Sequence, residues 1–330
     1  MSKPVTASAA SLAAFKRASL LLATIAIAAV PTLSRAVPVS RTWVSGVGSD
    51  ANPCSRAMPC LTFSGAMANT AAGGEIECLD PGHFGSAHIT QSLTIDCAET
   101  FSGIQQVLGN HVIVDAGAGD IVNLRGLNLN GSSLAGIGLN GIRFIGGHSL
   151  YVSRFTIKNY SGWGISVESG DNSVLFVHDS VFENNGSGAD SGGILIQPSA
   201  GSIHASIERV SLVDNVVGIK ASGASAGANG VHLALSECTV ASNAGNGVWA
   251  LRGIGTQTVV LVDNCKIVNN AGTGVLADTG ATVLLSRSTI ERNAIGANVT
   301  GGQLYTYQDN LIDNNLGVDL SAAAVIRSRK

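Results

Sequence analysis

Residues 260–275 read VLVDNCKIVNNAGTGV, and residues 233–248 read LALSECTVASNAGNGV. In both stretches apolar residues alternate with polar ones, a polar turn follows, and an asparagine and a glycine stand at matching places. Alternation over three to five residues is typical of a half-buried strand. Because the two stretches match position by position, each predicts one repeat built of short strands.

An asparagine recurs at the turn of successive repeats, and Tyr160 occupies the same place one repeat earlier. The steps between the asparagines are 30, 28, 27, 23 and 21 residues. Parallel strands of successive coils lie about 4.8 Å apart, so we expect equivalent residues to form ladders along the axis. The predicted ladder contains Asn185, Asn215, Asn243, Asn270, Asn293 and Asn314.

These repeats predict a β-solenoid, because they are short, vary in length and show no helical period. A propeller blade needs about 40 residues, and leucine-rich repeats need a helix-forming half. A left-handed hexapeptide helix would show a rigid short period. We therefore predict an all-β fold, a single-stranded right-handed parallel β-helix, since right-handed crossovers are the rule for parallel strands. Its inward ladders should be Val152, Val177, Ile207, Leu235, Val262 and Leu285, and Ile157, Phe182, Leu212, Val240, Ile267 and Ile290.

The composition agrees with many short strands and turns. Of the 330 residues, 45% are hydrophobic, only 12% are charged, and 41 are glycine. This balance argues against a helical bundle or a disordered chain. The formal net charge of −3 gives no electrostatic reason to expect nucleic-acid binding.

Residues 1–36 have the pattern of a signal peptide. Lys16 and Arg17 precede an apolar run over 18–30, and Ser34-Arg35-Ala36 offers small residues where a signal peptidase reads them. The run is shorter than the roughly 20 residues that span a bilayer, although an uncleaved anchor is the alternative. We expect a secreted or periplasmic protein with no membrane span in its mature part. The predicted division is 1–36 as signal peptide, 37–121 as N-terminal cap and first coils, 122–320 as repeat coils and 321–330 as C-terminal tail.

The repeats resemble those of the pectin lyase-like superfamily of right-handed parallel β-helices. The stretches RTWVSGVGSDANPC (41–54), PCLTF (59–63) and GGEIECLDPG (73–82) also resemble the opening of uncharacterised secreted bacterial proteins of this class. The resemblance implies a short capping helix over residues 62–72, with Phe63, Ala66 and Met67 turned to the first coil. Such a cap would protect the open end of the solenoid from edge pairing.

The resemblance carries over no active site. The pectate lyases of this superfamily hold calcium with clustered carboxylates on the strand beside the longest loops. In this chain the matching outward column has no carboxylate, lysine or arginine. Gly146-Gly147-His148 occurs without the Asp pair of polygalacturonases, and pectin methylesterase motifs are absent. We therefore expect no cofactor and no calcium requirement. The outward column is Tyr151, Phe176, Ser206, Ala234, Leu261, Leu284 and Tyr305.

Six cysteines in an exported chain favour disulfides. The candidate pairs are Cys54 with Cys60, Cys78 with Cys97, and Cys238 with Cys265. The first pair brackets a proline-containing loop and should form a local disulfide. The second pair follows equivalent isoleucines and could stack on neighbouring coils. The third shares an inward column, where a disulfide or two buried thiols would fit. No tight cysteine or histidine spacing indicates a metal site.

Charged residues gather at the turn after the loop-flanked strand. A row there alternates in charge over four coils, and we interpret it as a structural ladder worth a few tenths of a kcal/mol per pair. The row is Arg154, Asp179, Arg209, Glu237, Asn264, Arg287 and Gln308. A carboxylate pair in this region could also run glycoside hydrolysis, although any exposed turn carries polar residues. The weak catalytic candidates are His178, Asp179, Glu208, Arg209, Glu237 and Asp263.

Outward apolar side chains indicate contact with a ligand, a partner or a covering loop. Alternation after the repeat glycine turns Trp249 outward, between Lys220 and Leu276 of adjacent coils, where a sugar could stack on the indole. Tyr151 and Tyr305 face outward in the other column. The candidate ligand-binding residues are thus Trp249, Lys220, Leu276, Tyr151 and Tyr305, with cover by the long loops as the alternative.

These features lead to one main hypothesis, an exported β-helix protein that binds a polysaccharide, a cell-surface glycan or another surface partner without established catalysis. The alternatives are a polysaccharide lyase or glycoside hydrolase acting on an acidic polysaccharide, and a structural or adhesive surface protein. The sequence predicts no oligomeric state.

Overall fold

The computed structural model describes residues 37–328, apart from 105–107, 134–135, 225–229 and 254–255. The predicted signal peptide therefore lies outside the described residues. The described residues form one compact unit. In the described part no helix is long and apolar enough to cross a membrane.

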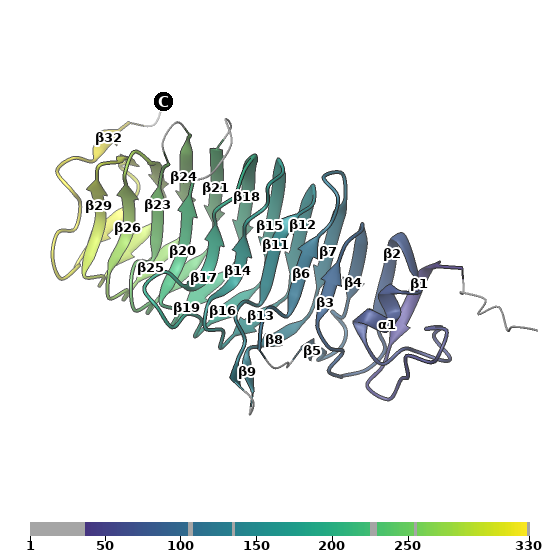
Figure 1. The fold of residues 1–330 in the computed structure, drawn as a ribbon. Coiled ribbons are helices and arrows are strands. Elements are labelled where there is room, and N and C mark those ends of the chain that lie inside the picture. The colour runs from purple at the N-terminus through teal and green to yellow at the C-terminus, as the bar shows by residue number, and fades with distance from the viewer. Residues whose placement is uncertain (1–36, 105–107, 134–135, 225–229, 254–255, 329–330) are drawn as a thin grey trace, which may run out of the picture. The chain divides into compact units, whose positions relative to one another are not determined.

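Three parallel sheets run along a stack of coils, and each full coil contributes one strand to each sheet (Figure 1). The first sheet has 12 strands: β1 (Val39–Val44), β2 (Thr70–Cys78), β4 (Leu93–Asp96), β7 (Ile121–Arg125), β12 (Ser149–Ser153), β15 (Ser173–His178), β18 (Ser202–Glu208), β21 (Gly230–Ser236), β24 (Thr258–Asp263), β27 (Thr282–Ser286), β30 (Gln303–Tyr307) and β32 (Val325–Arg327).

The chain passes next to the second sheet, whose nine strands are β5 (Gly103–Ile104), β8 (Asn128–Asn130), β13 (Thr156–Lys158), β16 (Val181–Glu183), β19 (Ser211–Val213), β22 (Thr239–Ala241), β25 (Lys266–Val268), β28 (Thr289–Glu291) and β31 (Leu311–Asp313). It then enters the third sheet, whose nine strands are β3 (Ala87–Ile89), β6 (Val112–Asp115), β11 (Ile142–Gly146), β14 (Trp163–Val167), β17 (Gly192–Ile196), β20 (Val217–Ser222), β23 (Val248–Leu251), β26 (Thr273–Asp278) and β29 (Ile295–Thr300). A small antiparallel hairpin, β9 (Ser132–Ser133) and β10 (Gly136–Ile137), projects from one coil (Figure 1).

The two ends of the stack differ from their predicted form. Helix α1 (Phe63–Met67) is shorter than the predicted 62–72 segment, because Thr70 already pairs with Val39 in the first sheet. Thr62 caps this helix, accepting the Gly65 N–H at 3.0 Å, and Phe63 is buried. At the other end the segment 321–330, predicted as a tail, contributes β32, which pairs with β30.

The predicted core is confirmed. The members of both inward ladders are buried, and the sheet registers place them on one another from coil to coil. In the first and second sheets the strands alternate between core and solvent, as β15 and β19 do. In the third sheet the outward side chains are largely covered as well, and every residue of β14 and β20 is buried. The all-β parallel β-solenoid is thus the fold that the alternation predicted.

The asparagine ladder at the turn between the second and third sheets is confirmed from Asn185 to Asn293. Asn243, for example, donates its backbone N–H and its side-chain amide to Asn270 Oδ1 at 3.1 and 2.8 Å. The last member is Asn315 and not Asn314, because Asn315 Oδ1 accepts the N–H of Asn293 at 3.0 Å. Asn314 has a left-handed backbone, with φ of 58°, and belongs to the turn position before the ladder.

The predicted row of alternating charges occupies the turn between the first and second sheets. Six of its residues have positive φ, between 49° and 57°, so they are left-handed turn residues with side chains at the surface. Only one predicted pair forms a direct ion pair, from Arg209 Nε to Asp179 Oδ1 at 2.8 Å. Arg154 instead approaches Glu99, at 4.0 Å. The six residues are Arg154, Asp179, Arg209, Glu237, Asn264 and Arg287.

The cysteines divide into two disulfides and two thiols. Cys54–Cys60 is bonded as predicted, and Cys78–Cys97 is bonded as well. Cys238 and Cys265 are free and buried. Their side chains take part in a second ladder, because Cys265 Sγ accepts the N–H of Cys238 at 3.4 Å, and Ser288 Oγ accepts the N–H of Cys265 at 3.1 Å.

Replacement of Cys265 tests this second ladder. A serine side chain at position 265 should both accept and donate a hydrogen bond, as Ser288 does one coil later. Cys265→Ser should therefore change the free energy of unfolding by well under about 1 kcal/mol. Valine fills the space but leaves the N–H of Cys238 without an acceptor, so Cys265→Val should cost about 1–2 kcal/mol. Urea unfolding of both variants measures the difference, and equal stabilities would contradict the ladder.

Candidate functional site

The outward face of the first sheet carries three columns of side chains, because every second residue of its strands points away from the core. The middle column, which we call the aromatic column, is the predicted outward column, and the strand registers confirm it. The column toward the start of the strands, the histidine column, contains Ser149, Val174, His204, His232, Val259, Thr282 and Gln303. The column toward the strand ends, the polar column, contains Arg125, Ser153, His178, Glu208, Ser236, Asp263 and Ser286.

The aromatic column contains a gap. The rings of Tyr151 and Phe176 stack with centroids 4.7 Å apart and planes 9° from parallel. The next two members are small, Ser206 and Ala234, and Leu261 follows them. Phe176 therefore turns its second ring face along the axis, toward a space that is two coils wide.

A hollow of about 300 Å³ fills this gap. Its walls are mostly apolar, with hydroxyl and imidazole groups among them. The lining residues are Val174, Phe176, His204, Ala205, Ser206, His232, Leu233, Ala234, Val259 and Leu261. A shallow apolar recess with a few polar groups is the usual form of a small-ligand site.

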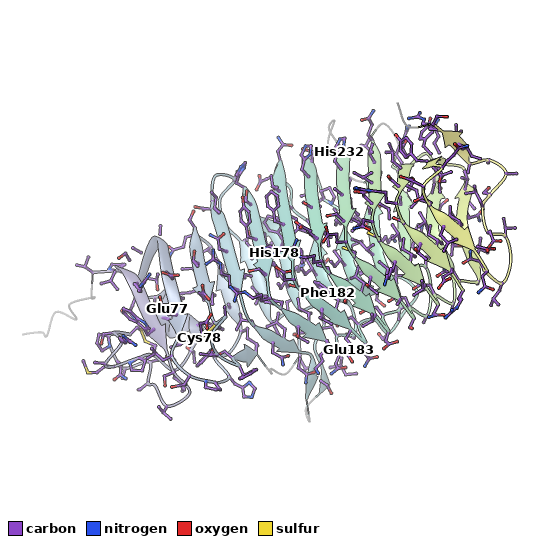
Figure 2. The ribbon with its side chains drawn as sticks, turned by 180° about the vertical axis from the view of Figure 1, so that it is seen from behind. Glu77, Cys78, His178, Phe182, Glu183 and His232 are labelled. Atoms are coloured by element: carbon purple, nitrogen blue, oxygen red, sulfur yellow. A yellow bond between two sulfur atoms is a disulfide. The ribbon has the colours of Figure 1, made fainter. Side chains whose placement is uncertain are left out.

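Two histidines border the hollow on one side. The rings of His204 and His232 stack at 5.0 Å between centroids, with planes 7° from parallel. His232 lies near the start of its strand, whereas His178 lies at the end of its strand, on the other side of the aromatic column (Figure 2). The hollow thus has imidazoles on one flank, and the polar column lies on the other side of the aromatic column, outside the lining of the hollow.

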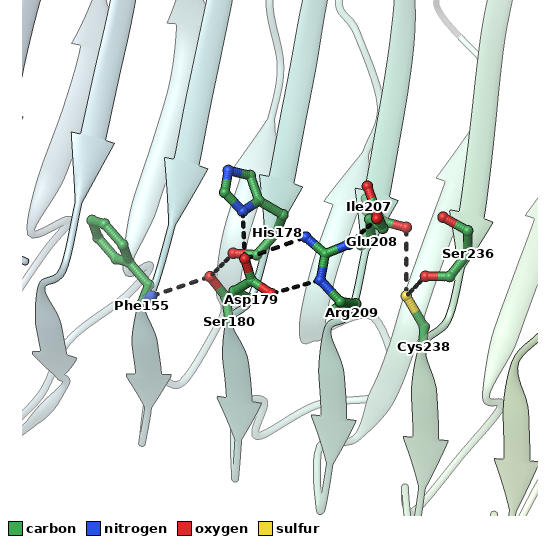
Figure 3. Close-up of polar contacts among 9 residues, drawn as sticks. All are labelled: Phe155, His178, Asp179, Ser180, Ile207, Glu208, Arg209, Ser236 and Cys238. Carbon is green, nitrogen blue, oxygen red and sulfur yellow. Dashed lines mark hydrogen bonds and ion pairs between the residues drawn. The ribbon is translucent and has the colours of Figure 1, made fainter.

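The structure brings four of the six catalytic candidates into one network at the strand ends (Figure 3). His178 Nδ1 lies 2.8 Å from Asp179 Oδ2, and Arg209 Nε donates to Asp179 Oδ1 at 2.8 Å. Arg209 also forms an ion pair with Glu208. The hydrogen bonds from Arg209 and then His178 lower the pKa of Asp179 to about 2.

The other two candidates lie in later coils. Glu237 occupies the left-handed turn after Ser236. The hydrogen bond with Asp179 is the main cause that raises the pKa of Arg209, and the charge of Glu237 adds a smaller effect. Asp263 forms an ion pair with Arg287. Glu208 and Asp263 share the polar column two coils apart, which corresponds to roughly 10 Å between their backbones.

This network is better suited to holding charge than to transferring protons. A general acid must carry its proton near neutral pH, and a carboxyl with a pKa of about 2 does not. Glu208 and Asp263 form ion pairs with Arg209 and Arg287. Among the residues that the structure describes, no group of three or more histidine, cysteine or acidic side chains could hold a metal ion.

The predicted Trp249 surface is on the third sheet, on a different face of the solenoid. Trp249 stands between Lys220 and Leu276, as the alternation predicted. Lys220 Nζ lies 4.4 Å from the centre of the indole and 2.6 Å from Asp190 Oδ1. The indole N–H donates to Asp278 Oδ2 at 3.2 Å. The polar edge and one ring face of Trp249 therefore already have protein partners.

The two predicted tyrosines lie at opposite ends of the aromatic column. Tyr151 is stacked on Phe176 outside the hollow. Arg327 covers Tyr305, with its guanidinium carbon 3.6 Å from the ring centre. His204 and His232, which line the hollow, were not among the predicted site residues. Extending the alternation two positions back from Ser206 and Ala234 would have found them.

Comparisons with known proteins agree with this architecture. The family described as "Right handed beta helix region" matches residues 218–328. The A-module of a mannuronan C-5 epimerase from Azotobacter vinelandii is similar in structure, with a TM-score of 0.54 at 15% identity over 74% of this chain and 68% of that chain. A periplasmic alginate epimerase has a TM-score of 0.50 at 12% identity over 78% of this chain and 77% of that chain. A search of curated protein sequences gave no match.

The chain is therefore a right-handed parallel β-helix. At these identities the likeness to the two epimerases concerns the fold, and the chemistry of the site has to be argued from this chain's own residues.

Proposed function

We propose that this protein is an exported carbohydrate-binding β-helix, and that a sugar ring occupies the gap in the aromatic column. The observation that carries the proposal is the free face of Phe176. Its other face is stacked on Tyr151, and the small side chains of Ser206 and Ala234 leave room for a ring parallel to it. A bound ring would continue the aromatic stack into the gap.

The flanks of the gap supply what a sugar needs beside an apolar surface. The C–H face of a pyranose packs on an aromatic ring, while its hydroxyl groups point sideways and require hydrogen-bond partners. His204 and His232 can supply them on one side. Ser236 and Glu208 of the polar column lie on the other side, two residues along the strands from Ala234 and Ser206, and can meet hydroxyl groups that extend beyond the hollow. A polysaccharide lying along the axis would then meet apolar groups below and polar groups at both edges.

The proposed binding involves no catalysis. Glu208 and Asp263 of the polar column are paired with arginines, and the lowered pKa of Asp179 keeps that carboxyl ionised far below neutral pH. Export is supported by the two disulfides, which persist in oxidising compartments such as the periplasm or the cell exterior.

Filling the gap with a protein side chain tests the proposal. The variant Ser206→Phe should extend the Tyr151–Phe176 stack by one ring and occupy the place of the sugar. We expect the unmodified protein to bind polymers on an immobilised polysaccharide array and Ser206→Phe to lose that binding. The melting temperature should stay close to the unmodified value, because position 206 faces outward.

The matched control is Ser211→Phe, the same change at an outward position of the second sheet. It should bind as the unmodified protein does. If Ser206→Phe binds undiminished, the gap is not the site and the proposal is wrong. If the unmodified protein releases reducing ends or unsaturated products from a bound polymer, it is an enzyme and the non-catalytic part of the proposal fails.

A further inference from the structure

A second hollow adjoins the first along the histidine column. It has a volume of about 270 Å³ and lies over the loops that lead from the third sheet to the first. Val259 lines both hollows, so the second begins where the first ends. Its lining is Arg252, Gln257, Thr258, Val259, Gly280, Thr282, Gly301, Gly302 and Gln303.

Arg252 is the charged residue of this second hollow. It follows β23, and its backbone N–H is fixed by Thr279 O at 3.1 Å. Its guanidinium lies against Gly280, since a Cβ there would stand 3.4 Å from Nε. Gly280 has a φ of 71°, which favours a residue without a side chain and keeps that surface flat.

The guanidinium of Arg252 has no carboxylate partner among the described residues. Its Nε donates to the backbone oxygen of Gly253 at 3.2 Å. The nearby Asp278 is occupied by other donors, namely Thr279, the hydroxyl of Thr300 and the indole of Trp249. Arg252 therefore keeps N–H donors for a group that enters the hollow from outside.

The other polar side chains of the hollow are neutral amides and hydroxyls, from Gln257, Thr258, Thr282 and Gln303. One guanidinium among neutral donors and acceptors matches a ligand group with a single negative charge and several oxygens. Carboxylate and sulfate groups of polysaccharides share this chemistry. A neutral sugar would leave the guanidinium without an anionic partner.

We infer that the second hollow is a subsite for an anionic substituent of the same glycan whose ring stacks on Phe176. This inference rests on the proposed function and adds the chemical class of the ligand, an acidic oligosaccharide. The register sets the spacing, because Val259 lies three coils after Phe176 and Thr282 lies four coils after it. Adjacent coils are about 4.8 Å apart, so the anionic group should lie roughly 14–19 Å along the axis from the Phe176 ring.

The test uses a panel of acidic polysaccharides, each paired with a neutralised form of the same polymer. Uronate polymers are paired with their carboxyl-reduced forms, and sulfated polymers with their desulfated forms, which separates the two sources of charge. The unmodified protein should bind at least one acidic form about tenfold or more tightly than its neutral form. Arg252→Gln should lose this preference and still bind the neutral form as the unmodified protein does.

The control is Lys266→Gln, which removes one exposed positive charge from the second sheet and should keep the preference. Equal binding of both forms by the unmodified protein, or a preference that survives Arg252→Gln, would overturn the inference and leave the proposed function intact. Undiminished binding of the neutral form by Ser206→Phe would instead overturn the proposed function. If no polymer binds in either form, both fail.

Discussion

Replacement of Asn270 by alanine should lower the free energy of unfolding by about 3 kcal/mol. Asn270 is 1% exposed and uses all of its side-chain groups. Its Oδ1 accepts two hydrogen bonds from Asn243, and its Nδ2 donates to Val240 O at 3.1 Å and to Asn293 Oδ1 at 2.8 Å. Alanine would leave buried donors and acceptors unsatisfied in two neighbouring coils, and each such group costs about 1–3 kcal/mol unless water reaches it.

The neighbouring residue provides a matched control. Asn269 is exposed and has a φ of 57°, a conformation that glycine adopts readily. Asn269→Gly removes an amide from the same turn without removing a ladder bond, so its stability should change by less than about 1 kcal/mol. Urea unfolding of both variants gives the comparison, and a loss below about 1 kcal/mol for Asn270→Ala would show that the ladder contributes little.

The asparagine ladder also shows which turn positions can be predicted from the sequence. Five of its members were predicted correctly, because the apolar alternation on both sides fixes their place in each coil. The sixth was off by one, since Asp313, Asn314 and Asn315 are all residues that turns accept, and no regular strand follows them to fix the count. In the structure Asp319 closes the ladder by accepting the N–H of Asn315 at 2.9 Å, a contact that no repeat predicts.

The candidate site was predicted less completely, for a physical reason. The alternation places the outward column correctly, and its large members Tyr151 and Tyr305 suggest a binding surface by their size. The hollow exists because Ser206 and Ala234 are small. The informative feature of the sequence was therefore a pair of small side chains between larger ones in the aromatic column. The charged candidates were correctly placed near one another, yet the sequence could not show that arginines neutralise the carboxylates. Ion pairs depend on side-chain directions that periodicity does not specify.

The same limit applies to Trp249, whose outward orientation between Lys220 and Leu276 was predicted, whereas its side-chain contacts with the Lys220 ammonium and with Asp278 were not. The hypothesis that a sugar stacks on this indole requires an accessible ring face, and Lys220 lies over one face while Asp278 accepts the N–H. The Lys220 side chain is only 8% exposed, so its ammonium depends on Asp190 and on the ring. The indole is therefore part of a packed cluster on the third sheet.

We expect Trp249→Ala to lower the free energy of unfolding by about 2 kcal/mol and to leave polysaccharide binding at the first sheet unchanged. The expected loss in stability has three sources: the buried part of the indole, its contact with the largely buried ammonium ion and its hydrogen bond to Asp278. It is smaller than the roughly 3–5 kcal/mol that removal of a fully buried ring costs, because the indole is only partly buried. Trp249→Phe keeps a ring beside Lys220 but lacks the N–H. It should therefore lower the free energy of unfolding by about half as much as Trp249→Ala does. Urea unfolding and the polysaccharide array measure the two effects separately. Loss of glycan binding in Trp249→Ala at unchanged stability would reverse this conclusion and move the binding site to the third sheet.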